Sequence, residues 1–342
     1  MKILIIQNKK IGDVLTTSVL FKAIKDNLNY TEMHYFVYSN ALSVINKNPN
    51  IDKIWHCKEE EFTGIKGVLK WYTIFKKENF DLIIDAYAKL STLSLVKLLN
   101  PGNSISFKKF YSNLFVKTSI KRLGEPKTSA TLGIEHRLQL VEPILGETNI
   151  YKPKIYLDKS ELNNAKQRLL KNSINPKKAL IMISILGSEN SKTYPYEYMA
   201  SLLDFLVNYD HEYSLLLNYI PNQKNQVQNI LNLCKSKTRK NIHQDFYSSD
   251  LREFICVTKH CKALIGNEGG ATNIAKAIEI PTFTIFSPNV KKKDWNIFED
   301  GRQNISVHVD DYFDTKAQNY DNFEPSLFYD KLKFFCKLNL QK

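Results

Sequence analysis

Residues 2–27 read KILIIQNKKIGDVLTTSVLFKAIKDN, and this stretch decides the fold class. Its start, Lys2–Ile6, is dominated by isoleucine and leucine, as expected of a parallel strand that is buried on both faces. A polar loop, Gln7–Gly12, leads into a predicted helix, Asp13–Asn27, whose apolar side chains fall largely on one face. A strand followed by a short loop and a helix is the opening unit of a doubly wound α/β domain.

The alternation of strands and helices recurs along the chain. After the first helix we expect strands at 34–37 and 81–85, with a helix at 68–77. A second series begins near Lys178, with strands at 179–185, 214–217, 263–266 and 282–286, the last being the final strand, and helices at 196–209, 224–234, 250–258 and 271–278. At about 100–200 residues per domain, 342 residues allow two domains, which the segment Tyr151–Leu157 separates.

We therefore predict an α/β protein with two Rossmann-like domains, residues 1–155 and 156–342, that face each other across a cleft. A terminal helix at 327–338 either stays with the second domain or returns to the first. Open sheets of this kind bind ligands beyond the carboxyl ends of their strands, so we expect the functional residues in the loops that follow the strands.

The composition narrows the partners and the compartment. A net charge of +13 favours a polyanionic partner, which is a nucleic acid, an anionic membrane surface or a phosphorylated ligand, and a generally basic surface from a lysine-rich composition is the less favoured alternative. No apolar run approaches the ~20 residues of a membrane-spanning helix, and the amino terminus lacks a signal-peptide layout, so we expect a cytoplasmic protein. The five scattered cysteines lack zinc-ligand spacing, and we predict no metal site.

The loop after the first strand argues against two nucleotide-binding folds. A dinucleotide dehydrogenase carries G-x-G-x-x-G at this point, and a P-loop protein carries G-x-x-x-x-G-K-S/T. Here the loop reads QNKKIGD, with a single glycine. Gly12 and Asp13 then lie at the start of a helix. The Asp13 carboxylate can accept a proton from a sugar hydroxyl there, or it can cap the helix, which contributes about 1 kcal/mol; the sequence leaves both readings open.

Two segments of the second half suit a phosphorylated ligand. Residues 265–273, IGNEGGATN, follow a predicted strand and open a helix, so the paired glycines and the free amides at the helix start can approach phosphate oxygens. A plain glycine turn between a strand and a helix is the simpler alternative. Lys192 follows the strand at 179–185, where its charge can neutralise phosphate.

A basic segment lies between residues 103 and 127. It has six Lys or Arg residues against one acid, Glu125, and four aromatic residues alternate with them. This pattern suits an anionic membrane surface. Solvated lysines over a half-buried helix fit the pattern equally well.

Together these segments resemble glycosyltransferase family 9, the bacterial heptosyltransferases that build the lipopolysaccharide inner core. Met1–Ile24 is similar to the family's amino terminus, and residues 81–85 followed by 89–99 are similar to its strand and helix near the acceptor site. Ser191–Pro195 resembles the family's S-K-R/x-W-P segment. Residues 266–288 resemble its signature G-N-D-S/T-G-x-x-H-x-x-A-A…G-V-P-T…F-G-P, with Glu268, Gly269 and Asn273 as departures that reshape the donor pocket.

The resemblance implies a GT-B type fold and an inverting, metal-independent transfer of heptose or a related sugar. The co-substrate would be a nucleotide-diphosphate sugar, ADP-linked in this family, and no cofactor is expected. The acceptor would be an anionic glycolipid at the inner-membrane surface, and no nucleic acid is expected. The implied residues are Asp13 as catalytic base; Lys192, Glu268, Gly269, Gly270, Ala271, Thr272 and Asn273 for the donor; and Gly12, Lys108, Lys109, Lys121 and Arg122 for the acceptor.

Two other hypotheses stay open at this point. A nucleotide-sugar epimerase has the same two-domain architecture and would use the donor without any lipid acceptor. A protein that binds polyanions without catalysis would exploit the charge of +13 and show steeply salt-dependent binding.

Overall fold

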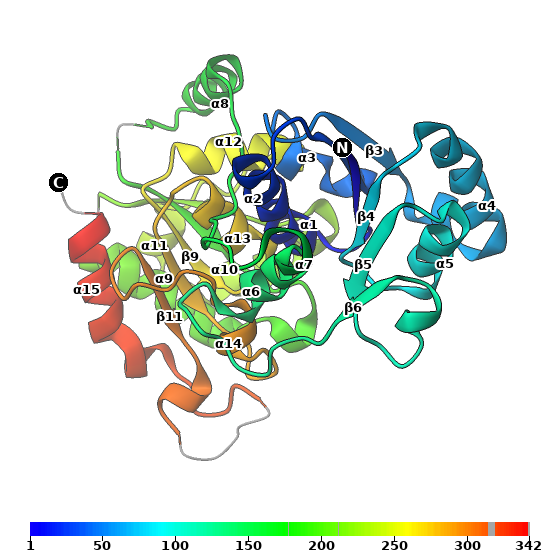
Figure 1. Cartoon of the computed structure of the whole chain (residues 1–342). Coiled ribbons are helices and arrows are strands. Elements are labelled where there is room, and N and C mark those ends of the chain that lie inside the picture. Colours follow the sequence, from blue (N-terminus) through cyan, green and yellow to red (C-terminus); the bar gives the residue numbers. More distant parts are fainter. Residues whose placement is uncertain (177, 211, 314–318, 341–342) are drawn as a thin grey trace. The chain divides into compact units, whose positions relative to one another are not determined.

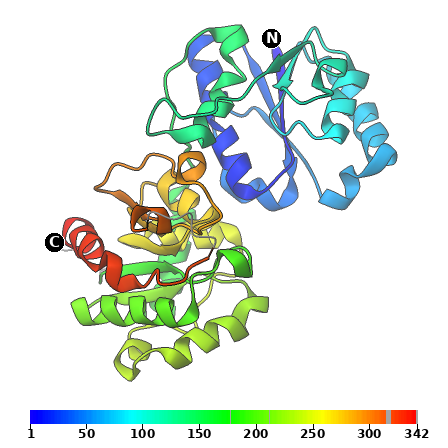
Figure 2. The same ribbon diagram turned by 90° about the horizontal axis from the view of Figure 1, so that it is seen from below.

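The structure is a computed structural model that describes residues 1–176, 178–210, 212–313 and 319–340. The chain divides into two compact units, Met1–Tyr156 and Leu157–Lys342. Each unit contains one parallel β-sheet with helices on both faces (Figures 1 and 2). The prediction of two α/β domains is therefore confirmed.

The first unit has the strand order β3-β2-β1-β4-β5-β6, and all neighbours are parallel. The strands are β1 (Lys2–Gln7), β2 (Glu32–Tyr38), β3 (Lys53–Cys57), β4 (Leu82–Asp85), β5 (Asn103–Phe107) and β6 (Thr118–Ile120). The α-helices are α1 (Ile11–Thr17), α2 (Val19–Asn27), α3 (Leu42–Ile45), α4 (Gly64–Phe75), α5 (Leu90–Leu99), α6 (Thr131–Gln139) and α7 (Glu142–Leu145). The order reverses between β1 and β4, and ligands of such sheets bind at this point, beyond the carboxyl ends of the strands.

The second unit has the parallel strand order β11-β10-β9-β7-β8. The strands are β7 (Leu180–Ser184), β8 (Ser214–Leu217), β9 (Ala263–Asn267), β10 (Thr282–Ile285) and β11 (Asn304–Val307). The α-helices are α8 (Lys159–Lys171), α9 (Tyr196–Tyr209), α10 (Lys224–Leu233), α11 (Ser236–Lys240), α12 (Leu251–Lys259), α13 (Gly270–Ala277), α14 (Lys292–Trp295) and α15 (Tyr329–Asn339). Here the order reverses between β7 and β9.

Three local predictions are wrong. The helix predicted over 13–27 is two helices, α1 and α2, that meet at Ser18, whose hydroxyl bonds back to the carbonyl of Leu15. The strand at 282–286 is not the final one, because β11 pairs with it. Residues 103–127 form the two short strands β5 and β6 and their connection, and not a half-buried helix.

The terminal helix α15 packs in the second unit. Leu332, Phe335 and Cys336 are fully buried in that unit's hydrophobic core. The ring of Phe335 lies against that of Phe283 on β10, with centroids 5.7 Å apart. Among the described residues, no helix combines the length and the apolar character that a membrane crossing requires.

Candidate active site

The loop after β1 places Asp13 at the reversal point of the first sheet. Helix α1 starts at Ile11 after the N-cap residue Lys10, so Asp13 lies in the first turn and caps nothing. Its side chain is buried, and its Oδ1 accepts from Nη2 of Arg137 at 2.8 Å and from Nζ of Lys9 at 3.2 Å. The cap interpretation of Asp13 is therefore wrong, and the carboxylate serves an ion pair.

Arg137 reaches Asp13 from α6, which is buried along almost its whole length. Burial lowers the pKa of Arg137, and the negative charge of Asp13 acts in the opposite direction. Both of these contacts fall on Oδ1 of Asp13. A ligand hydroxyl can therefore bind Oδ2 without displacing Arg137 or Lys9.

A second carboxylate, Asp85, ends the neighbouring strand β4. It is buried, and its oxygens accept from the amides of Tyr87 at 3.0 Å and Ala88 at 2.9 Å and from the hydroxyl of Thr92 at 2.7 Å. Burial raises the pKa of Asp85 to about 6, although these three hydrogen bonds oppose the shift. Ala88 has φ +55°, a left-handed conformation that costs a residue with a Cβ about 1 kcal/mol, so Asp85 stabilises a strained turn beside the loop of Asp13.

The four basic residues predicted to bind the acceptor also lie at this carboxyl edge, because they follow the parallel strands β5 and β6. Lys108 and Lys121 are exposed. The guanidinium of Arg122 lies 3.9 Å from the ring centre of Phe107, and it is close enough to Asp13 and Arg137 to interact with their charges. Lys109 differs from the others, since its ammonium donates to the carbonyl of Ala88.

Helix α6 also fixes the basic loop after β6. The carboxylate of Glu135 accepts from the backbone amides of Lys127 and Thr128 at 2.8 and 2.6 Å. Gln139 accepts from the amide of Leu123 at 3.2 Å. One buried helix therefore holds both the partner of Asp13 and the loop that carries Lys121 and Arg122. Gly12 lies one residue before Asp13, and its carbonyl accepts from the hydroxyl of Thr16.

In the second unit, Gly266 and Asn267 end β9 at the reversal point. A Cβ on Gly266, which has φ +131°, would lie 2.4 Å from the carbonyl oxygen of Ser184 on β7, so only glycine fits. Asn267 donates to that same oxygen at 2.9 Å and accepts from the amide of Tyr194 at 2.7 Å. The sequence motif contained Asn267, but its role as the link between β7, β9 and the loop of Lys192 was missed.

The loop that carries Lys192 is held close to the sheet. Gly187 approaches it so closely that a Cβ there would lie 2.4 Å from the Lys192 carbonyl oxygen. That oxygen accepts from the Tyr320 hydroxyl at 3.2 Å, and the Ser191 carbonyl accepts from the Ser287 hydroxyl at 3.4 Å. The Lys192 ammonium is 3.9 Å from Glu189 and is partly exposed. The backbone of Lys192 is therefore fixed, while its ammonium lies at the surface.

The glycine turn after β9 opens helix α13 at Gly270, with Gly269 as the N-cap residue. A Cβ on Gly269 or Gly270 would meet nothing within 4 Å, so the space above the turn is open. Glu268, Gly269 and Ala271 are partly exposed, Gly270 is exposed, and Thr272 and Asn273 are buried. The first amides of a helix have no partner within it, so this turn can bind an anion. The six predicted donor residues of the turn are thus together at the edge to which Lys192 belongs.

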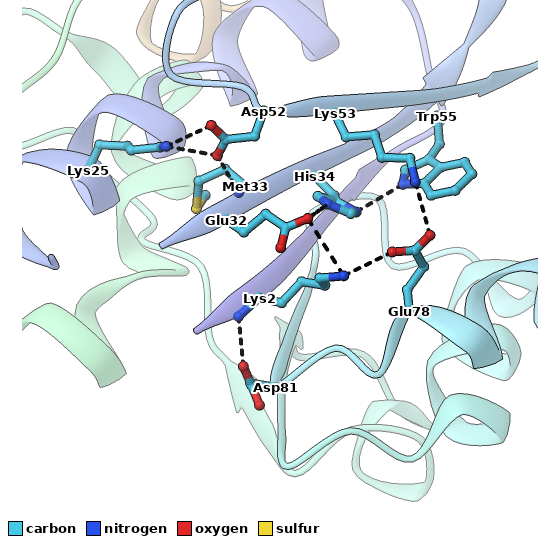
Figure 3. Close-up of polar contacts among 10 residues, drawn as sticks. All are labelled: Lys2, Lys25, Glu32, Met33, His34, Asp52, Lys53, Trp55, Glu78 and Asp81. Carbon is cyan, nitrogen blue, oxygen red and sulfur yellow. Dashed lines mark hydrogen bonds and ion pairs between the residues drawn. The ribbon is translucent and has the colours of Figure 1, made fainter. Parts of the chain in front are cut away.

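The amino edge of the first sheet has a different arrangement (Figure 3). Glu78 receives the ammonium groups of Lys2 at 3.0 Å and Lys53 at 2.9 Å, and Asp52 receives that of Lys25 at 2.7 Å. These ion pairs join strands to their flanking segments. Glu78 and Asp52 therefore each have a basic partner within the same cluster.

A buried histidine lies beside these ion pairs (Figure 3). Nε2 of His34 bonds Oε1 of Glu32 at 2.7 Å, and Nε1 of Trp55 donates to Nδ1 of His34 at 3.1 Å. Burial lowers the pKa of His34, although Glu32 acts to raise it. Nδ1 accepts a hydrogen bond, so the neutral ring fits this environment and the protonated ring does not.

Within the described ranges, no three His, Cys, Asp or Glu side chains gather as a metal site requires. All five cysteines are buried and unpaired with one another. Burial raises the pKa of several of these thiols, to about 12 for Cys57, Cys234 and Cys336. The carboxyl edges of the two sheets therefore present no reactive thiol among the described residues.

Comparison with known proteins gives a consistent result. The sequence profile of glycosyltransferase family 9 (heptosyltransferase) matches residues 69–320. Lipopolysaccharide heptosyltransferase 1 of Campylobacter coli is 23% identical over 299 residues, which cover 84% of each chain. The family 9 glycosyltransferase of Veillonella parvula has a similar solved structure, with a TM-score of 0.77 at 15% identity over 90% of this chain and 87% of that one. The structure of ADP-heptose lipopolysaccharide heptosyltransferase II of Escherichia coli is also similar, with a TM-score of 0.75 at 13% identity over 97% of both chains.

Proposed function

Because the chain belongs to glycosyltransferase family 9, we propose that it moves heptose or a related sugar from an ADP-linked donor to a lipopolysaccharide core or a related surface glycan. The transfer is an inverting, metal-independent displacement. The acceptor hydroxyl attacks the anomeric carbon, and the nucleotide diphosphate leaves. Membership of a transferase family favours this function over the epimerase and over the polyanion binder.

The observation that carries the proposal is the placement of Asp13. It is a buried carboxylate at the reversal point of the first sheet, with Oδ1 held by Arg137 and Lys9. Asp13 takes the proton of the acceptor hydroxyl on Oδ2 as the new bond forms. An aspartate is a weak base, so the effect of Asp13 comes mainly from its fixed position relative to the hydroxyl.

The second unit supplies the donor site in this proposal. Lys192 and the amides of residues 269–272 stabilise the negative charge that grows on the leaving diphosphate, without a metal ion. Glu268 contacts the donor sugar, and Asn273 lines the pocket. ADP is supported by the solved relative described as an ADP-heptose enzyme.

The acceptor in this proposal is an anionic glycolipid. Gly12 lies beside the base, and Lys108, Lys109, Lys121 and Arg122 gather at the same edge of the sheet. Phosphates on the acceptor pair with those cations, while the bonded hydroxyl lies at Asp13. Such an acceptor places the enzyme in the cytoplasm at the inner face of the inner membrane.

A thermal-shift panel of nucleotide diphosphates and nucleotide sugars tests the proposal, with wild type beside Lys192→Ala and Asp13→Ala. A donor at ~100 times its dissociation constant stabilises the protein by about 2.7 kcal/mol. We expect an ADP-sugar to stabilise wild type and Asp13→Ala, but not Lys192→Ala. If no nucleotide raises the melting temperature of wild type, the proposed function is wrong.

A further inference from the structure

The connection between β5 and β6, residues 108–117, exposes large apolar side chains; we call it the docking loop. Phe110 is fully exposed, and Leu114 is 71% exposed. A single exposed apolar residue is common on protein surfaces, but two in one short loop, one of them a whole phenylalanine ring, suggest a binding surface.

The docking loop is held rigidly in the first unit. Its residues Tyr111 and Phe115 pack on the hydrophobic core and against each other, with ring centres 6.3 Å apart. The hydroxyl of Ser112 donates to the carbonyl of Phe107 at 2.8 Å and accepts from the amide of Lys109 at 2.9 Å. Each inward aromatic residue follows an outward apolar one, so the fold itself directs Phe110 and Leu114 to solvent. Little conformational entropy remains to be lost when they are buried by a partner.

The surroundings of the docking loop are strongly basic. Between Asp85 and Glu135 the chain has eight Lys or Arg residues and one acid, Glu125. The bond from the Lys109 ammonium to the Ala88 carbonyl brings the docking loop alongside the start of α5, where Leu90 is 55% exposed next to Lys89. Exposed apolar side chains in a basic segment complement a surface that is negatively charged outside and apolar beneath.

We propose that the docking loop binds an anionic phospholipid bilayer. Phe110 and Leu114 enter the boundary between headgroups and acyl chains, and the exposed Lys108 and Lys121 pair with lipid phosphates. The docking loop starts at the carboxyl end of β5, at the edge that presents Asp13. Membrane binding therefore brings that edge to the plane in which a lipid-linked acceptor lies, and only this consequence rests on the proposed function.

Sedimentation of the full chain with vesicles tests the proposal without donor or acceptor. Wild type should bind vesicles of phosphatidylglycerol in phosphatidylcholine at least about tenfold more than vesicles of phosphatidylcholine alone. Phe110→Ser/Leu114→Ser should lower binding to the anionic vesicles by at least about tenfold. The matched control is Ile65→Ser on α4, where the side chain is 79% exposed in the same unit, and it should bind as wild type does.

The contribution of charge is measured in the same way. Lys108→Gln/Lys121→Gln should weaken binding to anionic vesicles by about fivefold per charge, whereas Lys66→Gln/Lys77→Gln, two exposed lysines elsewhere in the unit, should weaken it much less. A tryptophan at position 110 reports insertion directly. The emission of Phe110→Trp should shift to the blue on anionic vesicles, and that of Ile65→Trp should not.

Several outcomes would overturn the proposal. They are absence of wild-type binding to anionic vesicles, an equal loss in Ile65→Ser, and binding of single-stranded nucleic acid that depends on Phe110 while vesicle binding does not. A dimer that Phe110→Ser/Leu114→Ser dissociates, without vesicle binding, would identify a second copy of the chain as the occupant. The ADP-sugar thermal shift of the same variants separates this result from failure of the proposed function, because donor binding does not involve the docking loop.

Discussion

The amino edge of the first sheet neutralises its charges internally, whereas the carboxyl edge of the same sheet does not. At the amino edge, Glu78 lies between Lys2 and Lys53, and Asp52 pairs with Lys25 (Figure 3). At the carboxyl edge, Asp13 receives two cations on one oxygen, and the exposed Lys108 and Lys121 follow β5 and β6.

The charges at the amino edge stabilise the fold, whereas positive charges at the carboxyl edge can bind a ligand. The ion pairs at the amino edge join neighbouring segments. An excess of positive charge around one buried carboxylate is costly unless an anion is bound, so it indicates a binding site. The edges also differ in their response to acid, because the buried titratable groups are a histidine at one edge and a carboxylic acid at the other.

The largest effect is expected from Arg137→Met. It leaves the buried carboxylate of Asp13 without its main partner, and breaking a buried ion pair costs about 3–5 kcal/mol. The transfer rate should also fall by about 100-fold, because the base is no longer held in place. Urea unfolding and steady-state kinetics measure the two effects.

The double variant Asp13→Asn/Arg137→Met is the control for Arg137→Met. With both charges removed it should regain most of the stability, but none of the activity. A single variant Arg137→Met with wild-type stability and rate would show that the pair does not organise the site.

Asp85→Asn should change the pH dependence of stability by about 1 kcal/mol. The pKa of Asp85 is raised to about 6 by burial, so the folded state favours the protonated acid. This contribution to stability is fully present below the unfolded pKa of about 3.9 and is lost as pH rises through 6. Between pH 5 and pH 7, wild type should therefore lose about 1 kcal/mol that Asp85→Asn does not lose. Urea unfolding of wild type and Asp85→Asn at the two pH values measures this difference.

His34→Gln should change the pH dependence in the opposite direction. Burial lowers the pKa of His34, so the folded state favours the neutral ring. Its contribution is present above the unfolded pKa of about 6.5 and is lost as pH falls below that value. The charged groups around the ring are Glu32, Glu78 and Lys2. His34→Gln should remove part of the acid destabilisation of wild type in melts between pH 7 and pH 5, and unchanged melts would show that the ring does not resist protonation.

The smallest effect is expected from Lys25→Met at the amino edge. Its ion pair with Asp52 is exposed, and such pairs contribute from about 0 to 1 kcal/mol. The loss should shrink further in high salt, which screens exposed charges. Urea midpoints at two salt concentrations give the comparison, and a loss as large as that of Arg137→Met would remove the distinction between the edges.

The sequence predicted the strands that are buried on both faces, since continuous apolar runs identify them without any knowledge of neighbours. It missed β3, β5, β6 and β11. Three of these are edge or short strands, and residues such as NSISF and TSI show neither an apolar run nor a clear alternation. Their pairing comes from the adjacent strand, which a single segment of sequence does not reveal.

The candidate site was predicted in its residues but not in its contacts. Asp13 was identified from its loop, but its partner Arg137 is 124 residues away along the chain. Asn267 was part of the signature, but its two bonds depend on β7 and β9 being neighbours. Lys109 was assigned to the acceptor with the other cations, but the bond from its ammonium to the Ala88 carbonyl was not predicted. Contacts between distant segments exist only after the sheet order is known.

The most direct measurement compares two changes of the same chemistry at opposite edges, Asp13→Asn and Asp81→Asn. The rate of nucleotide diphosphate release from an ADP-sugar in the presence of a lipopolysaccharide acceptor is measured for both. Asp13→Asn should lower the rate by at least about 100-fold with donor binding unchanged, and Asp81→Asn should leave the rate at the wild-type value. Full activity of Asp13→Asn, or an equal loss in both variants, would contradict the assignment of the catalytic base to the carboxyl edge.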